Sequence, residues 1–227
     1  MSVVGVIFDM DGVLVLTEQA HWQSWLTPAG KRGVTLSYEK FKSCFGRINP
    51  DCIPVLFGPN VPAEDALAIA DEKEAAFRDI VRTNVPLAPG IVELLAELKR
   101  LGAKLAVGSS GPRENVELVV NAGGLAKYFD VLIDGSMVQR GKPAPDVFEL
   151  AARRMEVAPP ICAVIEDAPA GILAAVAAKM LAIAVTTTHP RSELEEAGAD
   201  QILDAPSQID SKTLVERLRQ RTELRGR

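Results

Sequence analysis

Most of this 227-residue chain alternates short apolar runs with segments of helical periodicity, and this alternation constrains the fold more than any other feature. The apolar runs at residues 104–108, 131–133, 161–165 and 181–185 are separated by stretches with the spacing of amphipathic helices. Strands that alternate with helices build parallel sheets, because each crossover helix returns the chain to the same edge. We therefore predict an α/β fold with a doubly wound parallel sheet, whose first strand is the apolar run before Asp9.

A second region, residues 18–86, lacks this alternation and has helical spacing throughout. Trp22 and Trp25 lie three residues apart there, and we interpret them as core residues of a helical unit. We predict that residues 18–86 form an inserted α-helical cap domain, and that residues 1–17 and 87–227 form the core domain. Because the insertion follows the first strand directly, the cap is expected to stand above the carboxyl end of the sheet.

Charge and composition limit the partners of the chain. The formal net charge is −5, and no apolar run is long enough to span a bilayer, so we expect neither a nucleic acid nor a membrane as partner. The three cysteines (Cys44, Cys52 and Cys162) form neither a disulfide set nor a metal-binding spacing, and no basic leader precedes the first apolar run. These features predict a cytoplasmic protein. The basic stretch 217–227 is interpreted as a solvated, fraying end.

Polar residues follow four of the predicted strands. The first strand ends in Asp9 and Asp11, which an extended backbone places on one face, where their repulsion requires a cation, a shared proton or a bound electrophile. The other strands are followed by Ser109 and Ser110, by Lys142, and by Glu166 and Asp167. Each of these alone has an ordinary interpretation as a turn, a helix cap or a solvated charge. Together they predict a site, because the carboxyl ends of parallel strands meet at one edge.

The same segments resemble the four signature motifs of the haloacid dehalogenase superfamily. The matching segments are residues 8–14 (FDMDGVL), Ser109, residues 141–146 (GKPAPD) and residues 165–172 (IEDAPAGI). The resemblance covers nearly the whole chain. It is strongest to the branch that has a small helical cap after the first motif, which contains sugar-phosphate phosphatases and β-phosphoglucomutase. It implies a Rossmann-type core and phosphoryl transfer.

The resemblance also assigns roles to the acidic residues. Asp9 would be the nucleophile that forms an aspartyl phosphate, and Asp11 would act as general acid and then as general base. Magnesium would be held by Asp9, by the backbone carbonyl of Asp11 and by Asp167, with Glu166 supporting the ion less directly. Dehalogenases of this family lack the second aspartate, because a halide leaves without a proton. Asp11 therefore favours phosphoryl transfer.

The remaining candidate residues would bind the substrate. Lys142 would neutralise Asp9 and the phosphoryl oxygens, and Ser109, with Ser110 beside it, would donate hydrogen bonds to those oxygens. His21 lies twelve residues beyond Asp9, a spacing found in β-phosphoglucomutase and in many related phosphatases.

His21 would either contact substrate or only make a hydrogen bond between the domains. Gly46 and Arg47 resemble the cap segment that holds a distal phosphate in the family, and we expect them to bind substrate. Lys73 has acidic neighbours and is interpreted as part of a solvated helix face.

Two positions depart from the family pattern. Many relatives have an acidic residue where this chain has Leu16, at the expected hinge of the cap. A glycine commonly stands where this chain has Lys179. A lysine in a left-handed helix cap costs about 1 kcal/mol, so we expect this helix to end differently.

Three functions remain open from the sequence. The first is a Mg²⁺-dependent phosphatase of small phosphorylated metabolites, such as sugar or polyol phosphates, acting as a monomer or weak homodimer. The second is a mutase of the β-phosphoglucomutase type, which returns the phosphoryl group to a sugar instead of to water. The third is a non-catalytic module that binds phosphorylated ligands. Such a module is expected to have lost Asp9, Asp11 or Lys142, and this chain has all three.

Overall fold

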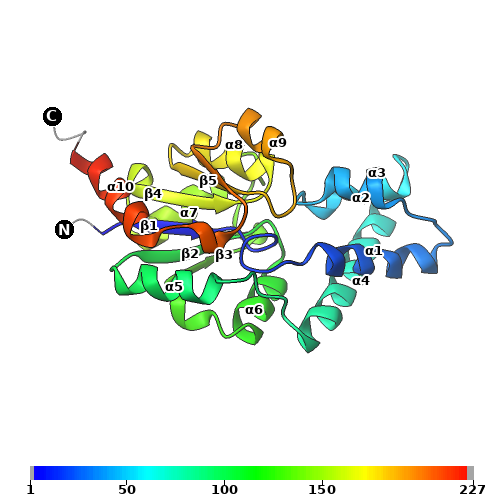
Figure 1. The fold of residues 1–227 in the computed structure, drawn as a ribbon. Helices are drawn as coiled ribbons and strands as arrows, with labels where there is room; N and C mark the ends of the chain where they lie inside the picture. Colours follow the sequence, from blue (N-terminus) through cyan, green and yellow to red (C-terminus); the bar gives the residue numbers. More distant parts are fainter. Residues whose placement is uncertain (1–2, 224–227) are drawn as a thin grey trace.

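The computed structural model describes residues 3–223, and its centre is a six-stranded parallel sheet (Figure 1). The strands are β1 (Gly5–Phe8), β2 (Lys104–Gly108), β3 (Val131–Ile133), β4 (Cys162–Glu166), β5 (Leu181–Val185) and β6 (Gln201–Leu203). Their order across the sheet is β3-β2-β1-β4-β5-β6, so the order reverses between β1 and β4. Ligands of such sheets bind at this reversal, beyond the carboxyl ends of the strands. The predicted doubly wound α/β fold is confirmed.

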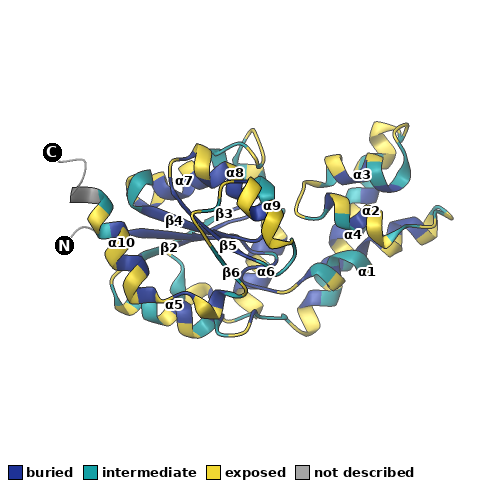
Figure 2. Ribbon diagram, turned by 45° about the horizontal axis from the view of Figure 1, so that its top comes forward, coloured by how far each residue is buried: buried dark blue, intermediate teal, exposed yellow. Residues whose placement is uncertain are grey.

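Helices cover both faces of the sheet, and the strand side chains pack against both layers. Val6 and Phe8 of β1 join a buried cluster with α5 (Ile91–Arg100), α6 (Arg113–Ala122) and α10 (Ser211–Glu223). Ile7 points to the opposite face and joins a cluster with α7 (Asp146–Met155), α8 (Pro169–Ala177) and α9 (Arg191–Glu196). The central strands β1, β4 and β5 are buried on both sides (Figure 2), which explains why they consist almost entirely of apolar residues.

The shorter connections contain four 3₁₀ helices. These are η1 (Ala126–Tyr128), η2 (Gly135–Met137), η3 (Pro159–Ile161) and η4 (Pro206–Gln208). Across residues 3–223, no helix combines the length and the apolar character that crossing a membrane requires.

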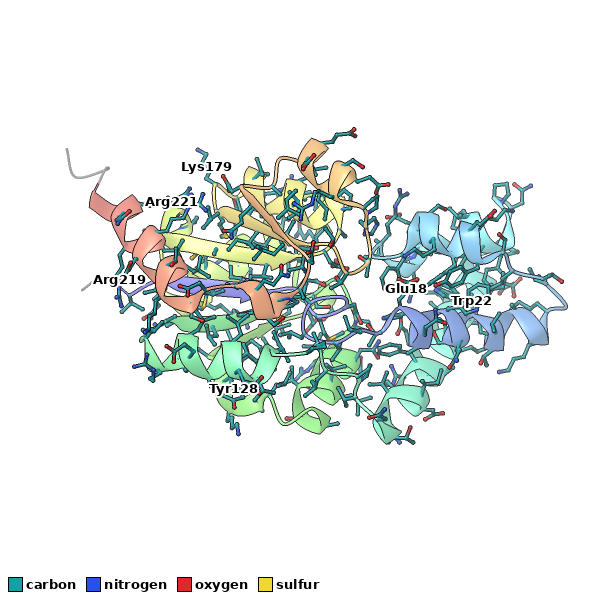
Figure 3. The ribbon with its side chains drawn as sticks, viewed as in Figure 1. Glu18, Trp22, Tyr128, Lys179, Arg219 and Arg221 are labelled. Carbon is teal, nitrogen blue, oxygen red and sulfur yellow. The ribbon has the colours of Figure 1, made fainter. Side chains whose placement is uncertain are left out.

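Four helices lie beyond the carboxyl end of the sheet (Figure 1). They are α1 (Glu18–Lys31), α2 (Tyr38–Cys44), α3 (Asn49–Phe57) and α4 (Ala63–Thr83). Their side chains form a separate buried cluster that contains Trp25, Phe41 and Ile69, and Trp22, on α1 in Figure 3, packs against it. Phe77, further along α4, belongs instead to the cluster of the sheet. The separate cluster supports the predicted division into a core and a cap at residues 18–86, which stays a prediction.

The chain enters and leaves this helical region along two paired segments. The N–H of Leu16 donates to the carbonyl of Pro86 at 2.8 Å, and the N–H of Ala88 donates to the carbonyl of Leu14 at 2.9 Å. The side chain of Leu16 is exposed beside this pairing. The apolar residue at this position therefore meets solvent and not the buried core.

Two expectations about helix ends are wrong. Helix α8 keeps the left-handed cap, because Lys179 has a φ of 61° and the N–H of Met180 donates to the carbonyl of Ala175. Figure 3 places Lys179 on the side of the core away from the cap. The stretch from residue 217 continues helix α10 through Glu223, so it is not frayed there; Leu218 is fully buried, whereas Arg217 and Gln220 are exposed to solvent. Residues 224–227 of that expectation lie outside the described residues.

Candidate active site

The ammonium of Lys142 lies between two carboxylates at the carboxyl ends of β1 and β4. Its Nζ donates to Asp9 Oδ1 at 2.5 Å and to Glu166 Oε1 at 2.6 Å. The other oxygen of Glu166 accepts from the backbone N–H groups of the next two residues, both at 2.9 Å. Glu166 is therefore fixed by its own backbone, and it holds Lys142 against Asp9. The convergence of these strand ends, which was expected from the sequence, is present in the structure.

Three carboxylates meet around this lysine. One oxygen each from Asp9, Glu166 and Asp167 lies within 4.8 Å of the others. Burial raises the pKa of Asp9 to about 8, with Lys142 opposing the rise and Glu166 adding to it. Burial, together with Glu166 and Asp9, also raises the pKa of Asp167 well above its ordinary value. One ammonium leaves this cluster with excess negative charge, and such an all-oxygen donor set fits a divalent cation like Mg²⁺.

Asp167 is anchored by a residue that the sequence analysis does not single out. The hydroxyl of Thr188 donates to Asp167 Oδ2, and the carbonyl of Thr188 accepts from Lys42 of helix α2 at 3.0 Å. The neighbouring Thr187 donates to the carbonyl of Gly12 at 2.6 Å, so this loop also holds the turn after β1. Gly12 has a φ of 84°, and a Cβ there would stand 2.0 Å from Asp167. The sequence could have indicated Thr187 and Thr188 as site residues, because they stand just after the predicted strand 181–185.

Asp11 points away from the lysine and toward the cap helices. Its Oδ1 accepts from the hydroxyl of Thr17 and pairs with His21 Nε2 at 3.0 Å. Burial would raise the pKa of Asp11, but the charge and hydrogen bond of His21, with the hydroxyl of Thr17, outweigh it and lower this pKa. The two aspartates are only two residues apart, yet their pKa values are shifted in opposite directions. Such a separation is how one site divides two roles between two carboxylates.

His21 is held rigidly between aromatic rings. It stacks on Phe77 with 4.1 Å between ring centroids and meets Phe45 edge-on at 5.7 Å. The hydrogen bond to Asp11 links helix α1 to the end of β1, which is one of the two interpretations left open for His21. Direct contact of His21 with a substrate stays a prediction.

The two serines after β2 line the same cavity as Asp9 and Lys142. Ser109 is only 1% exposed, and its Oγ accepts from the N–H of Gly111 at 3.0 Å. The hydroxyl hydrogen of Ser109 is therefore available for another acceptor in the cavity. Ser110 is less buried and also faces the cavity.

The wall of the cavity opposite the sheet contains Gly46 and Arg47, as expected. Gly46 has a φ of 85°, a backbone conformation that favours glycine. Arg47 is exposed, and its guanidinium makes no ion pair or hydrogen bond with other side chains among residues 3–223. The charge of Arg47 is thus open to an anionic group in the cavity, and its contact with a substrate stays a prediction.

Lys73 is buried, so the interpretation as part of a solvated helix face is wrong. It is 4% exposed, its Nζ donates to Glu74 Oε1 at 2.8 Å, and it lies over the rings of Trp25 and Phe77 at 5.5 Å each. The sequence did contain a signal, because Lys73 stands four residues from both Ile69 and Phe77. It belongs to the apolar stripe of α4, whereas its acidic neighbours in sequence suggested a polar face.

A polar network connects this buried lysine to the core. Glu74 accepts from Asn49 at 2.8 Å and from Asn115 of helix α6 at 2.6 Å, and Asn115 in turn accepts from Arg78 at 3.1 Å. All except Arg78 line the cavity. No local sequence pattern indicates this network, because its members are separated by up to 66 positions and none stands at a strand end. The network ties α4 to the core on the flank of the cavity opposite Lys42.

Comparison with known proteins places these motifs in a family. A family model described as a haloacid dehalogenase-like hydrolase matches residues 3–179. The chain is 33% identical over 195 residues to validoxylamine A 7'-phosphate phosphatase of Streptomyces hygroscopicus subsp. limoneus, covering 84% of this chain and 89% of that protein. It is 29% identical over 218 residues to β-phosphoglucomutase of Bacillus subtilis, covering 93% of each.

A solved structure extends the comparison to three dimensions. A mutant of CbbY from Rhodobacter sphaeroides, in complex with xylulose-(1,5)bisphosphate, matches with a TM-score of 0.81 and 28% identity, covering 91% of this chain and 96% of that chain. The family model's region, residues 3–179, contains all four motifs that carry the strand-end residues. The chain therefore belongs to the haloacid dehalogenase-like hydrolase family, as its motifs predict.

Proposed function

We propose that this protein is a Mg²⁺-dependent phosphatase that hydrolyses small phosphate monoesters, of the sugar or polyol phosphate type, through an aspartyl phosphate. The observation that carries the proposal is the division between the two aspartates. Asp9 is paired with Lys142, whereas Asp11 is held toward the cap by Thr17 and His21. A nucleophile beside a fixed cation and an acid–base group aimed at the leaving group are what two-step ester hydrolysis requires.

The chain's own residues can carry both steps. A carboxylate oxygen of Asp9 attacks phosphorus, the bond from phosphorus to the ester oxygen breaks, and Asp11 gives a proton to the departing alcohol. Asp11 then takes a proton from water, which attacks the same phosphorus and releases phosphate and free Asp9. The lowered pKa keeps Asp11 in the ionised form that can accept a proton, and an approaching phosphate dianion favours the protonated form that can donate one.

Lys142 and Ser109 have electrostatic tasks in both steps. Buried Lys142 is held by Glu166 and favours the ionised form of Asp9, which opposes the rise in the pKa of Asp9 caused by burial and by its acidic neighbours. Lys142 and Ser109 can also stabilise negative charge on the phosphoryl oxygens, and Ser110 is a further donor at the same edge. These groups are already positioned, so their electrostatic effect needs little rearrangement during the reaction.

The proposed metal site uses the carboxylates of Asp9 and Asp167, with the backbone carbonyl of Asp11 as the ligand that the family implies. When bound there, Mg²⁺ supplies positive charge that offsets the transferred phosphoryl group and the three carboxylates. Thr188 orients Asp167 for this role. Glu166 accepts hydrogen bonds at both of its oxygens, and it contributes by fixing Lys142.

A panel of phosphorylated metabolites tests the proposal. We expect Mg²⁺-dependent release of inorganic phosphate from one or more sugar or polyol phosphates, and no release by the Asp9→Asn variant. The variant is expected to fold, because it removes one of three crowded carboxylates. Circular dichroism provides the control for folding. Phosphate release by folded Asp9→Asn at the wild-type rate would refute the aspartyl-phosphate mechanism.

A phosphosugar mutase is the second candidate, and the 29% identity to β-phosphoglucomutase supports it. Both activities use the same aspartyl phosphate and differ in whether water or a sugar hydroxyl receives the phosphoryl group. Incubation with a hexose phosphate, Mg²⁺ and a trace of sugar bisphosphate separates them. An isomerised hexose phosphate without free phosphate identifies a mutase, whereas phosphate released in step with substrate loss identifies a phosphatase.

A further inference from the structure

Two of the three cysteines pack together in the wall of the cavity. Cys44 is the last residue of α2, and Cys52 lies in the first turns of α3. The thiol of Cys52 donates to the carbonyl of Cys44 at 3.0 Å, and the thiol of Cys44 donates to the carbonyl of Phe41 at 3.4 Å. Both side chains are buried from the outer surface and line the cavity that contains Asp9 and Lys142. The catalytic steps described above use neither thiol.

The surroundings make the two thiols chemically unequal. The neighbouring thiol of Cys52 and the positive charge of Arg47 lower the pKa of Cys44 despite its burial. The neighbouring Cys44, together with burial, raises the pKa of Cys52. A thiol that ionises readily beside one that stays protonated is the usual arrangement of an attacking and a resolving cysteine.

We propose that Cys44 and Cys52 form a reversible disulfide in the folded protein when it meets a peroxide. The thiolate sulfur of Cys44 attacks one oxygen of hydrogen peroxide, the O–O bond breaks, and a sulfenic acid and hydroxide form. The sulfur of Cys52 then attacks the sulfur of Cys44, the S–O bond breaks, and hydroxide leaves as water. Two thiols and one peroxide thus give one disulfide and two waters, and an added dithiol reverses the change.

The disulfide would act on the substrate-binding wall, a consequence that rests on the proposed function. The seven residues between the two cysteines include Gly46, Arg47 and Asn49, which line the cavity. A bond between the sulfurs replaces the hydrogen bond from Cys52 to the carbonyl of Cys44 and draws the ends of α2 and α3 together. A displacement of about 1 Å in a positioning group can change turnover by up to ~100-fold. We expect kcat/KM for a sugar phosphate to fall roughly tenfold on oxidation.

The third cysteine provides a matched control. Cys162 is fully buried in β4, is absent from the cavity lining, and donates only to the carbonyl of Ala158 at 3.5 Å. Burial raises the pKa of Cys162 to about 12, so its thiolate is scarce at neutral pH. The Cys162→Ala variant should therefore form the disulfide as the wild type does.

The experiment treats the folded, full-length protein with hydrogen peroxide, quenches it, and counts free thiols after unfolding. We expect two of the three thiols to disappear, a peptide that links Cys44 to Cys52 in the digest, and full recovery with dithiothreitol. Cys162→Ala should give the same linked peptide, whereas Cys44→Ala and Cys52→Ala should not form it. Cys44→Ser and Cys52→Ser are tested as well. If an alanine variant folds poorly, the serine variant of the same cysteine replaces it in the comparison.

Each result bears directly on the proposal. Absence of the linked peptide from folded protein, or its formation only under unfolding conditions, would overturn the disulfide. A linked peptide with unchanged kcat/KM would overturn its effect on the substrate wall. Thiol counts and peptide mass do not depend on turnover, so they remain informative even if the protein hydrolyses none of the phosphate esters. Failure of the phosphatase proposal is thereby distinguished from failure of the disulfide.

Discussion

At the scale of single residues, the loss of turnover on removing Asp11 should depend strongly on which leaving group the substrate carries. It is held toward the cap by Thr17 and His21, where an ester oxygen would depart. We expect Asp11→Ala to reduce turnover of a sugar phosphate by about 10²- to 10⁴-fold, as for the loss of a general acid. An activated aryl phosphate should be affected much less, because its phenolate leaves without a proton. Steady-state rates on both substrates provide the measurement.

The matched control for this prediction is Thr17→Val, which removes the hydroxyl but keeps the carboxylate of Asp11. That change should reduce turnover of the sugar phosphate by less than Asp11→Ala does, and turnover of the aryl phosphate by less still, because the acid is still present but less well oriented. Equal losses on the two substrates in Asp11→Ala would contradict the role of Asp11 as an acid.

Residues at strand ends could be predicted from sequence, whereas residues that act through helix faces could not. Asp9, Lys142 and Asp167 stand directly after apolar runs or in the loops that follow them, and parallel strands bring such positions to one edge. Lys73 and Asn115 reach the cavity from helices, where the exposed or buried face depends on how the cap packs against the core. That packing is a property of distant contacts, which local spacing does not encode.

At the scale of elements, helix α8 ends in a left-handed backbone conformation that is unfavourable for the lysine at that position. Lys179 occupies the left-handed position of the cap, with its N–H donating to the carbonyl of Val176 at 2.9 Å. A side chain there costs about 1 to 2 kcal/mol that glycine avoids, although glycine also gives the unfolded chain more freedom. We expect Lys179→Gly to raise the free energy of unfolding by about 0.5 to 1 kcal/mol, as measured by urea denaturation.

Lys179→Ala separates backbone strain from the loss of the lysine side chain. Alanine keeps the Cβ and therefore the strain, so this variant should be no more stable than the wild type. Lys179 lies on the side of the core away from the cap, so phosphate release should be unchanged in both variants. Equal stabilisation by alanine and glycine would show that the left-handed backbone is not the cause.

Most strands could be predicted because they are buried on both faces and therefore consist of apolar runs. The runs at 104–108, 131–133 and 181–185 coincide with β2, β3 and β5. Strand β6 was missed, because it has three residues at the edge of the sheet and begins with exposed Gln201. The edge strand β3 is equally short but consists of three apolar residues, whereas β6 has only two, too few to be distinguished from a loop.

At the scale of the whole molecule, cap and core are joined on both flanks of the cavity as well as at the hinge. Glu74 and Asn115 join them on one flank, and Lys42 donates to the carbonyl of Thr188 on the other. Thr188 also donates to Asp167, so the second connection reaches the proposed metal site. Helices α2 and α4 and the acidic cluster are thus parts of one hydrogen-bonded structure, and stability should respond to a bound cation.

This connection predicts how stability depends on pH and magnesium. Burial raises the pKa of Asp9 from 3.8 to about 8, so in that interval the folded protein holds protons that the unfolded chain has released. Stability of the metal-free protein should therefore fall as pH rises through this window. Magnesium competes with those protons and binds only the folded state, so its stabilising effect should grow with pH. We expect a larger increase in Tm on adding Mg²⁺ near pH 8 than near pH 5, relative to protein in a chelator.

Asp9→Asn isolates the contribution of this carboxylate in the same thermal unfolding series. Burial lowers the pKa of His189 from 6.5, which makes stability rise with pH below that value, but this effect is common to both proteins and cancels in the comparison. Without metal, the Tm of Asp9→Asn should exceed that of the wild type near pH 8, because a buried negative charge is gone. With Mg²⁺ the order should reverse, since the variant has lost a ligand. A variant that gains as much from Mg²⁺ as the wild type would remove Asp9 from the metal site.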